Sequence, residues 1–167
     1  MTVTLRPALP ADLPLLKRWD EDPAVLESDP NDDWHWADEL AKSPPWREQL
    51  IIEHDGVPVG FVQIIDPAEE DSHYWGDCGP NLRAVDIWIG EPAHRGGGVG
   101  TQAMRLAIAR CFAAEDVTAI VIDPLATNTA AIRFYERLGF RFVERRLFGE
   151  DDCFVMRLED GRLKTEE

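Results

Sequence analysis

The feature that most constrains this chain is a run of glycines between a predicted strand and a predicted helix. Residues 94–104 read HRGGGVGTQAM, with three consecutive glycines and a fourth two positions later. The preceding segment, 83–90, alternates apolar and polar side chains as a strand does, and the following one, 99–114, repeats apolar side chains at helical spacing. Glycines there allow a positive φ or a close approach to the main chain. Because a helix N-terminus attracts anions, the segment predicts a phosphate-binding loop.

The remaining sequence predicts one α/β (α+β) domain over residues 1–160, with a mixed central sheet flanked by helices and a frayed tail at 161–167. Asp55–Gly56 lies between two apolar segments of 48–67, which is a strong signal for a β-hairpin. The other strands are expected at 2–8, 83–90, 117–123, 140–148 and 153–158. The helices are expected at 11–19, 34–41, 99–114 and 128–138. The nearly continuous apolar segment 117–123 is typical of a strand buried on both faces.

The acidic composition excludes several kinds of partner. The chain has 32 acidic and 17 basic residues and a net charge of −15. Such a charge repels polyanions at long range, so neither nucleic acid nor an anionic membrane surface is expected as a partner. No segment approaches the roughly 20 apolar residues of a membrane helix, and the N-terminus lacks the apolar core of a signal peptide. A cytoplasmic protein is therefore expected, and the sequence says nothing of its oligomeric state.

Cysteine and histidine spacing predicts no metal site. The three cysteines, Cys78, Cys111 and Cys153, form no C-x-x-C motif, and the four histidines form no H-x-x-x-H motif. Neither a disulfide framework nor a zinc site is expected from this spacing.

Acidic residues gather in segments 27–39, 66–77 and 149–152. The simplest interpretation is a set of solvated surfaces. Two of these segments also contain aromatic residues, namely Trp34, Trp36, Tyr74 and Trp75. Because carboxylates and aromatic faces both attract ammonium groups, a site for a polycation is the alternative interpretation.

Two common phosphate-binding loops do not fit the glycines. A P-loop needs a lysine after its last glycine, but Thr101 and Gln102 follow here. Gly98, Gly100 and Ala103 fit the G-x-G-x-x-A pattern of a dinucleotide-binding loop, but that pattern follows its strand in a tight turn. Here the residues EPAHR intervene, and too few residues remain afterwards for a second nucleotide-binding half.

A third pattern fits well. Arg95, Gly98 and Gly100 form R-x-x-G-x-G, and residues 128–140 form N-x-x-A-I-x-x-Y-E-x-x-G-F. In this order the two motifs resemble the acetyl-CoA-binding half of the GNAT N-acetyltransferase superfamily, and the opening LRPALPADLPLLKRW extends the resemblance over nearly the whole chain. The resemblance implies acetyl-CoA as cosubstrate, held between two parallel strands, 83–89 and 117–123, that splay apart.

The resemblance also implies roles for single residues. Main-chain N–H groups of Arg95–Gly100 would surround the pyrophosphate. Asn128 would lie near the cofactor arm, although an N-cap explains it equally well. Tyr135 would protonate the departing thiolate, its alternative being a core aromatic residue. The predicted cofactor-binding residues are Ile87, Trp88, Ile89, Arg95, Gly96, Gly97, Gly98, Val99, Gly100, Thr101, Asn128 and Tyr135.

Within the superfamily, LRAVDIWIG and IDPLATNTAAIRFYERLGF are similar to aminoglycoside 6′-N-acetyltransferases. The resemblance implies that Asp86 and Asp123 line the acceptor site, and Asp71 falls where that family has another substrate-binding aspartate. Trp75 is included among the substrate-binding residues. Asp86 is the first candidate for the general base, because a carboxylate on an apolar strand needs a partner or a function. A main-chain N–H near Ile87 or Trp88 would meet the oxyanion.

The predicted catalytic residues are thus Asp86 and Tyr135, in a direct reaction between acetyl-CoA and a cationic primary amine, with the 6′-amine of an aminoglycoside as the first candidate. Another amine, such as a polyamine, a siderophore precursor or a peptide amine, is the main alternative. A non-catalytic module that binds CoA or sequesters an antibiotic is the second.

Overall fold

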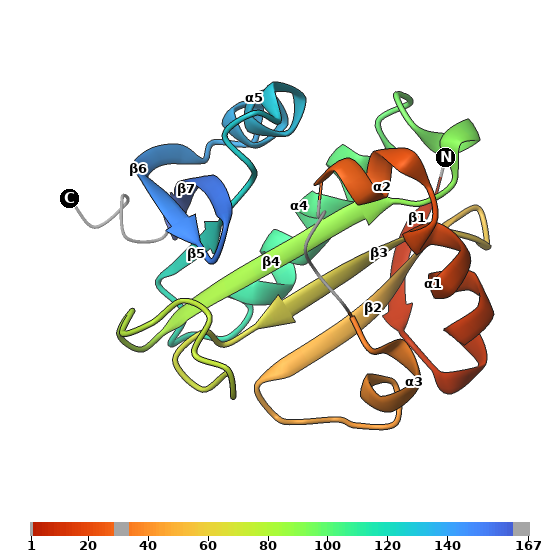
Figure 1. The fold of residues 1–167 in the computed structure, drawn as a ribbon, viewed down its shortest axis with the longest axis horizontal. Coiled ribbons are helices and arrows are strands. Elements are labelled where there is room, and N and C mark those ends of the chain that lie inside the picture. The colour runs from red at the N-terminus through yellow and green to blue at the C-terminus, as the bar shows by residue number, and fades with distance from the viewer. Residues whose placement is uncertain (1, 29–33, 162–167) are drawn as a thin grey trace. The chain divides into compact units, whose positions relative to one another are not determined.

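The computed structural model describes residues 2–28 and 34–161 as a mixed α/β protein (Figure 1). Within these residues the strands are hydrogen-bonded in the order β1-β2-β3-β4-β5-β7-β6. The strands are β1 (Val3–Pro7), β2 (Arg47–His54), β3 (Val57–Ile65), β4 (Leu82–Ile89), β5 (Ala119–Ile122), β6 (Arg141–Phe148) and β7 (Asp151–Glu159). The helices are α1 (Leu13–Asp20), α2 (Pro23–Ser28), α3 (Trp36–Glu39), α4 (Val99–Phe112) and α5 (Thr129–Arg137), with 3-10 turns at Pro10–Asp12 and Pro92–His94. The predicted fold class is confirmed.

The described chain divides into two compact units. The first comprises the described residues of Met1–Gln63 and Asp86–Leu106, and the second those of Ile64–Val85 and Ala107–Glu167. The single domain over 1–160 therefore stays a prediction. Residues 29–33 of the acidic segment 27–39, and the predicted tail beyond Gly161, lie outside the described residues.

In the first unit, β1 and β2 are antiparallel, with a register from Val3↔His54 to Pro7↔Leu50. Asp55 and Gly56 connect β2 to β3 with φ angles of 50° and 84°. Two consecutive positive φ angles are the signature of a hairpin turn whose twist matches the flanking strands. The predicted hairpin is confirmed.

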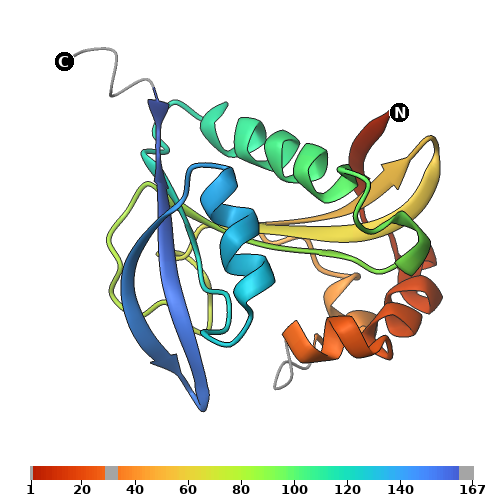
Figure 2. The same cartoon turned by 90° about the horizontal axis from the view of Figure 1, so that it is seen from above.

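The core of the first unit lies between its strands and α1 and α3. Leu16 and Trp19 are three residues apart on α1, so they share one face of the helix and are both buried. They pack with Ile51 of β2 and Phe61 of β3. Figure 2 shows α1 and α3 on one side of β2 and β3, and the N-terminal half of α4 on the other side. The strands of this unit therefore present one face to a core rich in aromatic side chains.

Two helices of the first unit differ from the prediction. The helix predicted at 34–41 is only Trp36–Glu39, and α2 was not predicted. A local signal for α2 exists, because Asp22 accepts a 3.0 Å hydrogen bond from the main-chain N–H of Ala24. An aspartate cap followed by proline is a common helix start.

In the second unit, β5 is parallel to β4, from Leu82↔Ala119 to Ala84↔Val121, and antiparallel to β7. All four residues of β5 are buried, as the continuous apolar sequence predicts. The ladder with β5 uses only the N-terminal part of β4, and the splaying of the two strands stays a prediction. Gly139, with φ of 102°, follows the end of α5.

We expect Gly90→Ala to destabilise the first unit. A Cβ at Gly90 would lie 2.2 Å from Cγ of the buried Trp19, whose indole N–H also donates a 2.9 Å hydrogen bond to Glu91. Overpacking of this kind costs about 2 kcal/mol of the free energy of unfolding. Denaturant unfolding followed by tryptophan fluorescence measures the loss. Gly97→Ala is the control, because a Cβ there meets nothing within 4 Å. Equal unfolding midpoints for the two variants would contradict the expectation.

Candidate functional site

The glycine loop presents its main chain to solvent. Gly96 and Gly98 have φ angles of 80° and 87°, which favour glycine over residues with a side chain. A Cβ at Gly96, Gly97 or Gly98 would meet nothing within 4 Å, so no neighbouring side chain or backbone crowds the loop. The helix α4 begins at Val99, and its first N–H groups have no acceptor within the helix. This geometry suits an anion that approaches the backbone.

The Arg95 side chain anchors the loop instead of extending toward a phosphate. Its Nε donates a 2.9 Å hydrogen bond to the Ile89 carbonyl, and its Nη2 lies 3.1 Å from Asp22 Oδ1. The neighbouring His94 pairs with His54, with 2.8 Å between their Nδ1 atoms. These contacts tie the segment between β4 and the glycines to α2 and β2. The Arg95 side chain is therefore engaged within the protein, and the predicted contact of Arg95 with the cofactor would come from its main chain.

Asp86 lies on β4 in the same unit as the glycine loop. Gln63 Nε2, on the neighbouring strand β3, is 3.4 Å from Asp86 Oδ2. Gln49 Nε2, on β2, donates a 3.0 Å hydrogen bond to Gln63 Oε1. All three side chains are half-buried. The predicted base therefore lies at one end of a row of polar side chains that sequence analysis did not find.

An aromatic cluster formed by Trp34, Trp36, Phe61 and Trp88 lies next to this row. Trp34 and Trp36 are stacked at 5.1 Å, and Phe61 is 4.7 Å from Trp88 between ring centroids. The Trp36 indole N–H donates a 2.5 Å hydrogen bond to Asp20. The Trp88 side chain thus belongs to the cluster, which leaves its main chain for the predicted contact with the cofactor.

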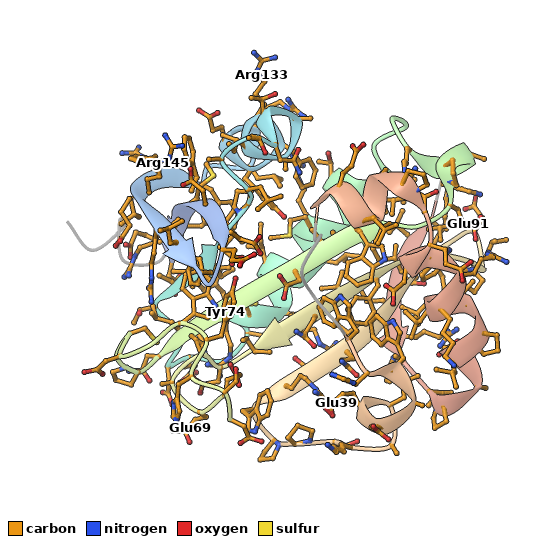
Figure 3. All side chains as sticks on the ribbon, viewed as in Figure 1. Glu39, Glu69, Tyr74, Glu91, Arg133 and Arg145 are labelled. Atoms are coloured by element: carbon orange, nitrogen blue, oxygen red, sulfur yellow. The ribbon has the colours of Figure 1, made fainter. Side chains whose placement is uncertain are left out.

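In the second unit, Asp123 follows β5 and accepts a 2.5 Å hydrogen bond from the hydroxyl of Tyr74, which Figure 3 labels. The Tyr74 ring is stacked on Phe148 at 4.6 Å, and the guanidinium of Arg146 also lies 4.6 Å from the Phe148 ring. Trp75 packs edge-on against Phe148 and is 6% exposed, whereas Tyr74 is 42% exposed. Of the two adjacent aromatic residues, Tyr74 is the one that a ligand can reach.

Asp71 lies in an exposed turn of the second unit. The buried acid of this turn is Glu70, which accepts hydrogen bonds from the Ser72 hydroxyl and from the main-chain N–H of Tyr74. Desolvation raises the pKa of Glu70, but these hydrogen bonds outweigh it and hold the pKa below its ordinary value. Glu70 thus shapes the turn that presents Tyr74, while a substrate-binding role of Asp71 stays a prediction.

Asn128 and Tyr135 both belong to the α5 segment. Asn128 Oδ1 accepts a 3.2 Å hydrogen bond from the Ala131 N–H and caps the helix. Tyr135 is 8% exposed, and its ring packs edge-on against Phe134 and Phe140. Both structural alternatives of the sequence analysis are therefore observed. The predicted roles of the Asn128 amide near the cofactor and of the Tyr135 hydroxyl as a proton donor stay predictions.

The predicted site residues fall into two groups. The first unit contains Asp86 and Ile87–Ile89 together with Arg95–Thr101, and the second contains Asp71, Trp75, Asp123, Asn128 and Tyr135. Across residues 2–28 and 34–161 no cluster of three or more His, Cys, Asp or Glu side chains could hold a metal ion. Among the helices of these residues, none is long and apolar enough to cross a membrane.

These features define a mixed α/β protein with a solvent-exposed glycine loop between a central strand and a helix. The chain belongs to the acetyltransferase (GNAT) domain family, whose model matches residues 8–148. The family predicted from the two motifs is thereby confirmed.

Named relatives match parts of the chain. It is 31% identical over 87 residues to aminoglycoside N(6')-acetyltransferase type 1 of Klebsiella pneumoniae and, to the same extent, of Serratia marcescens. Each match covers 52% of this chain and 43% of the relative. It is 33% identical over 72 residues to a kanamycin resistance protein of Rhizobium radiobacter, which covers 42% of this chain and 67% of the relative. The chain thus spans less than half the length of the first two relatives.

Solved structures match the whole fold. The aminoglycoside acetyltransferase AAC(6')-Ib in complex with coenzyme A and kanamycin has a TM-score of 0.85 and 24% identity over 98% of both chains. The same enzyme with paromomycin and acetyl-CoA has a TM-score of 0.83 and 24% identity, over 98% of this chain and 97% of that one. At this level of identity the likeness establishes the fold.

We expect Gly98→Ala to weaken acetyl-CoA binding about tenfold, because a side chain at φ of 87° forces the loop out of the conformation that exposes its N–H groups. Titration calorimetry with acetyl-CoA measures the change. The matched control is Gly149→Ala, which also has a positive φ and open surroundings but lies in the β6–β7 turn. Unchanged affinity in Gly98→Ala, or an equal loss in Gly149→Ala, would contradict an anion site at the loop.

Proposed function

We propose that this protein transfers an acetyl group from acetyl-CoA to a primary amine of a cationic small molecule, with the 6′-amine of an aminoglycoside as the first candidate. The observation that carries the proposal is the position of Asp86. This carboxylate lies on β4, the strand that precedes the glycine loop in the chain, so one compact unit contains both a carboxylate and an exposed glycine backbone.

The loop fits the cofactor by its chemistry. Exposed main chain at Gly96–Gly98 and the start of α4 would bind the pyrophosphate without a lysine or a metal ion. When bound, acetyl-CoA supplies the thioester that is attacked. AAC(6')-Ib, which shares this fold, is solved with coenzyme A and with acetyl-CoA, which supports the same cosubstrate for this chain.

Asp86 would make the amine reactive. An alkylamine is mostly protonated at neutral pH and has no lone pair until it loses a proton. Asp86 would first accept that proton, directly or through water, and so free the lone pair. The nitrogen would then bond to the acetyl carbon and, as the carbon–sulfur bond breaks, lose a second proton to water, which balances the proton that the thiolate receives. The Tyr135 hydroxyl would protonate the departing thiolate, and main-chain N–H groups near Ile87 and Trp88 would stabilise negative charge on the carbonyl oxygen.

Acidic and aromatic side chains support a cationic acceptor. The net charge of −15 attracts a polycation at long range. At short range, the exposed Tyr74 ring and the Asp123 carboxylate offer a face and an acceptor for ammonium groups. The similarity to aminoglycoside acetyltransferases and to a kanamycin resistance protein favours aminoglycosides among such compounds.

We place the activity in the cytoplasm, as the sequence predicts. Cys78, Cys111 and Cys153 are all free thiols, which suits a reducing compartment.

A panel of amines tests the proposal by release of the CoA thiol. We expect turnover with an aminoglycoside that has a 6′-amine and none with a matched aminoglycoside that has a 6′-hydroxyl. Turnover only with polyamines or peptide amines would assign the chain to another acceptor. Calorimetric binding of acetyl-CoA and aminoglycoside without thiol release would instead identify a binding module.

Asp86→Asn is expected to lower kcat about a hundredfold while leaving the Kd of acetyl-CoA nearly unchanged, because the amide cannot take the proton. Steady-state kinetics and calorimetry give the two numbers. Asp116→Asn, an exposed aspartate in the turn before β5, is the control and should match the unmodified protein. Loss of acetyl-CoA binding in Asp86→Asn would show that Asp86 is structural.

A further inference from the structure

We propose that Gln63 and Gln49 are positioning residues that orient the Asp86 carboxylate through a row of side-chain amides across β2, β3 and β4. The inference rests on the proposed function, in which Asp86 accepts the proton of the amine. It adds two residues that touch neither cofactor nor reacting atoms in the proposal.

Strand geometry places the three side chains in one row. Alternate residues of a strand face the same side of a sheet, so Gln49 shares the face of Ile51, and Gln63 that of Phe61. The side chains of Ile51 and Phe61 belong to the core beneath α1 and α3, where Trp88 also packs. Asp86 is two residues before Trp88 on β4 and therefore faces that side too. The polar row Gln49, Gln63, Asp86 thus runs beside an apolar row of Ile51, Phe61 and Trp88.

Hydrogen-bond chemistry gives the row one direction. An ionised carboxylate only accepts hydrogen bonds, so Gln63 must turn its NH₂ group toward Asp86. Its carbonyl oxygen then faces β2, where the Gln49 NH₂ group donates to it at 3.0 Å. If the Gln63 amide were reversed, an oxygen would face the carboxylate and two NH₂ groups would face each other. The orientation of both amides is therefore the one that suits an ionised carboxylate at Asp86.

A side-chain amide lowers the basicity of a carboxylate less than a guanidinium does. Elsewhere in the same unit, Asp12 receives two 2.9 Å hydrogen bonds from Arg6, which hold the pKa of that carboxyl below its ordinary value. Desolvation raises the pKa of Asp22, yet its contact with Arg95 also leaves it lowered. A carboxylate paired with a guanidinium in this way is a poor base. The Gln63 amide contacts one carboxylate oxygen of Asp86 and brings no positive charge of its own.

Amide NMR tests the row without relying on turnover. The chain contains three glutamines, Gln49, Gln63 and Gln102, so a sample labelled with ¹⁵N-glutamine gives one side-chain NH₂ pair for each. We expect Asp86→Asn to shift the Gln63 pair upfield, because the neutral acceptor forms a weaker bond, and to shift the Gln49 pair through Gln63. The exposed Gln102 is the internal control and should not move. A Gln49 pair that stays in place would overturn the row.

Kinetics tests the consequence for catalysis. We expect Gln63→Leu to lower kcat about tenfold and Gln49→Leu about threefold, with the Kd of acetyl-CoA unchanged in both. Glu48→Leu is the control on the same strand, because Glu48 is exposed and faces the other side of the sheet. If Gln49→Leu and Glu48→Leu have the same kcat, the positioning role is wrong. A protein that acetylates no amine but shows the linked NMR shifts would refute the proposed function and leave the row of amides intact.

Discussion

The contact between the Arg95 guanidinium and the Ile89 carbonyl determines what the glycine loop can do. It closes the chain between the end of β4 and the glycines, and the ion pair with Asp22 fixes the same side chain to the start of α2. Because the Arg95 side chain is held by these bonds, an anion at the loop would contact backbone N–H groups and not the guanidinium. Asp86, the proposed base, and the glycine loop, the proposed anion site, lie in the same compact unit.

Local chemistry made much of the fold predictable. Asp55–Gly56 specifies its turn through two positive φ angles, and the apolar segment at β5 specifies burial on both faces. Asn128 was recognisable as a cap, and Gly96 and Gly98 adopt the positive φ that their residue type allows. In each case the deciding interaction lies within a few residues, so the sequence alone contains it.

Other parts of the site depend on contacts between distant residues. Gln49 and Gln63 lie on different strands from Asp86, so their hydrogen bonds depend on how the three strands pair and cannot be read from the sequence. Tyr74 and Trp75 are neighbours of similar chemistry, and packing on Phe148 decides which of them stays accessible. The sequence alone therefore could not show whether Trp75 or Tyr74 is the accessible one of the two. Sequence motifs identified the glycine loop and the carboxylates, whereas the side chains that contact them are determined by tertiary packing.

The close approach of Gly90 to the Trp19 ring links two positions far apart in the chain. The indole occupies the volume that a side chain at residue 90 would need, and its N–H is bound to the next residue, Glu91. A homologue with a larger residue at 90 must therefore carry a smaller ring or an aliphatic residue at 19. Across the family residues 19 and 90 should therefore vary together, and residue 19 must become smaller before residue 90 can become larger.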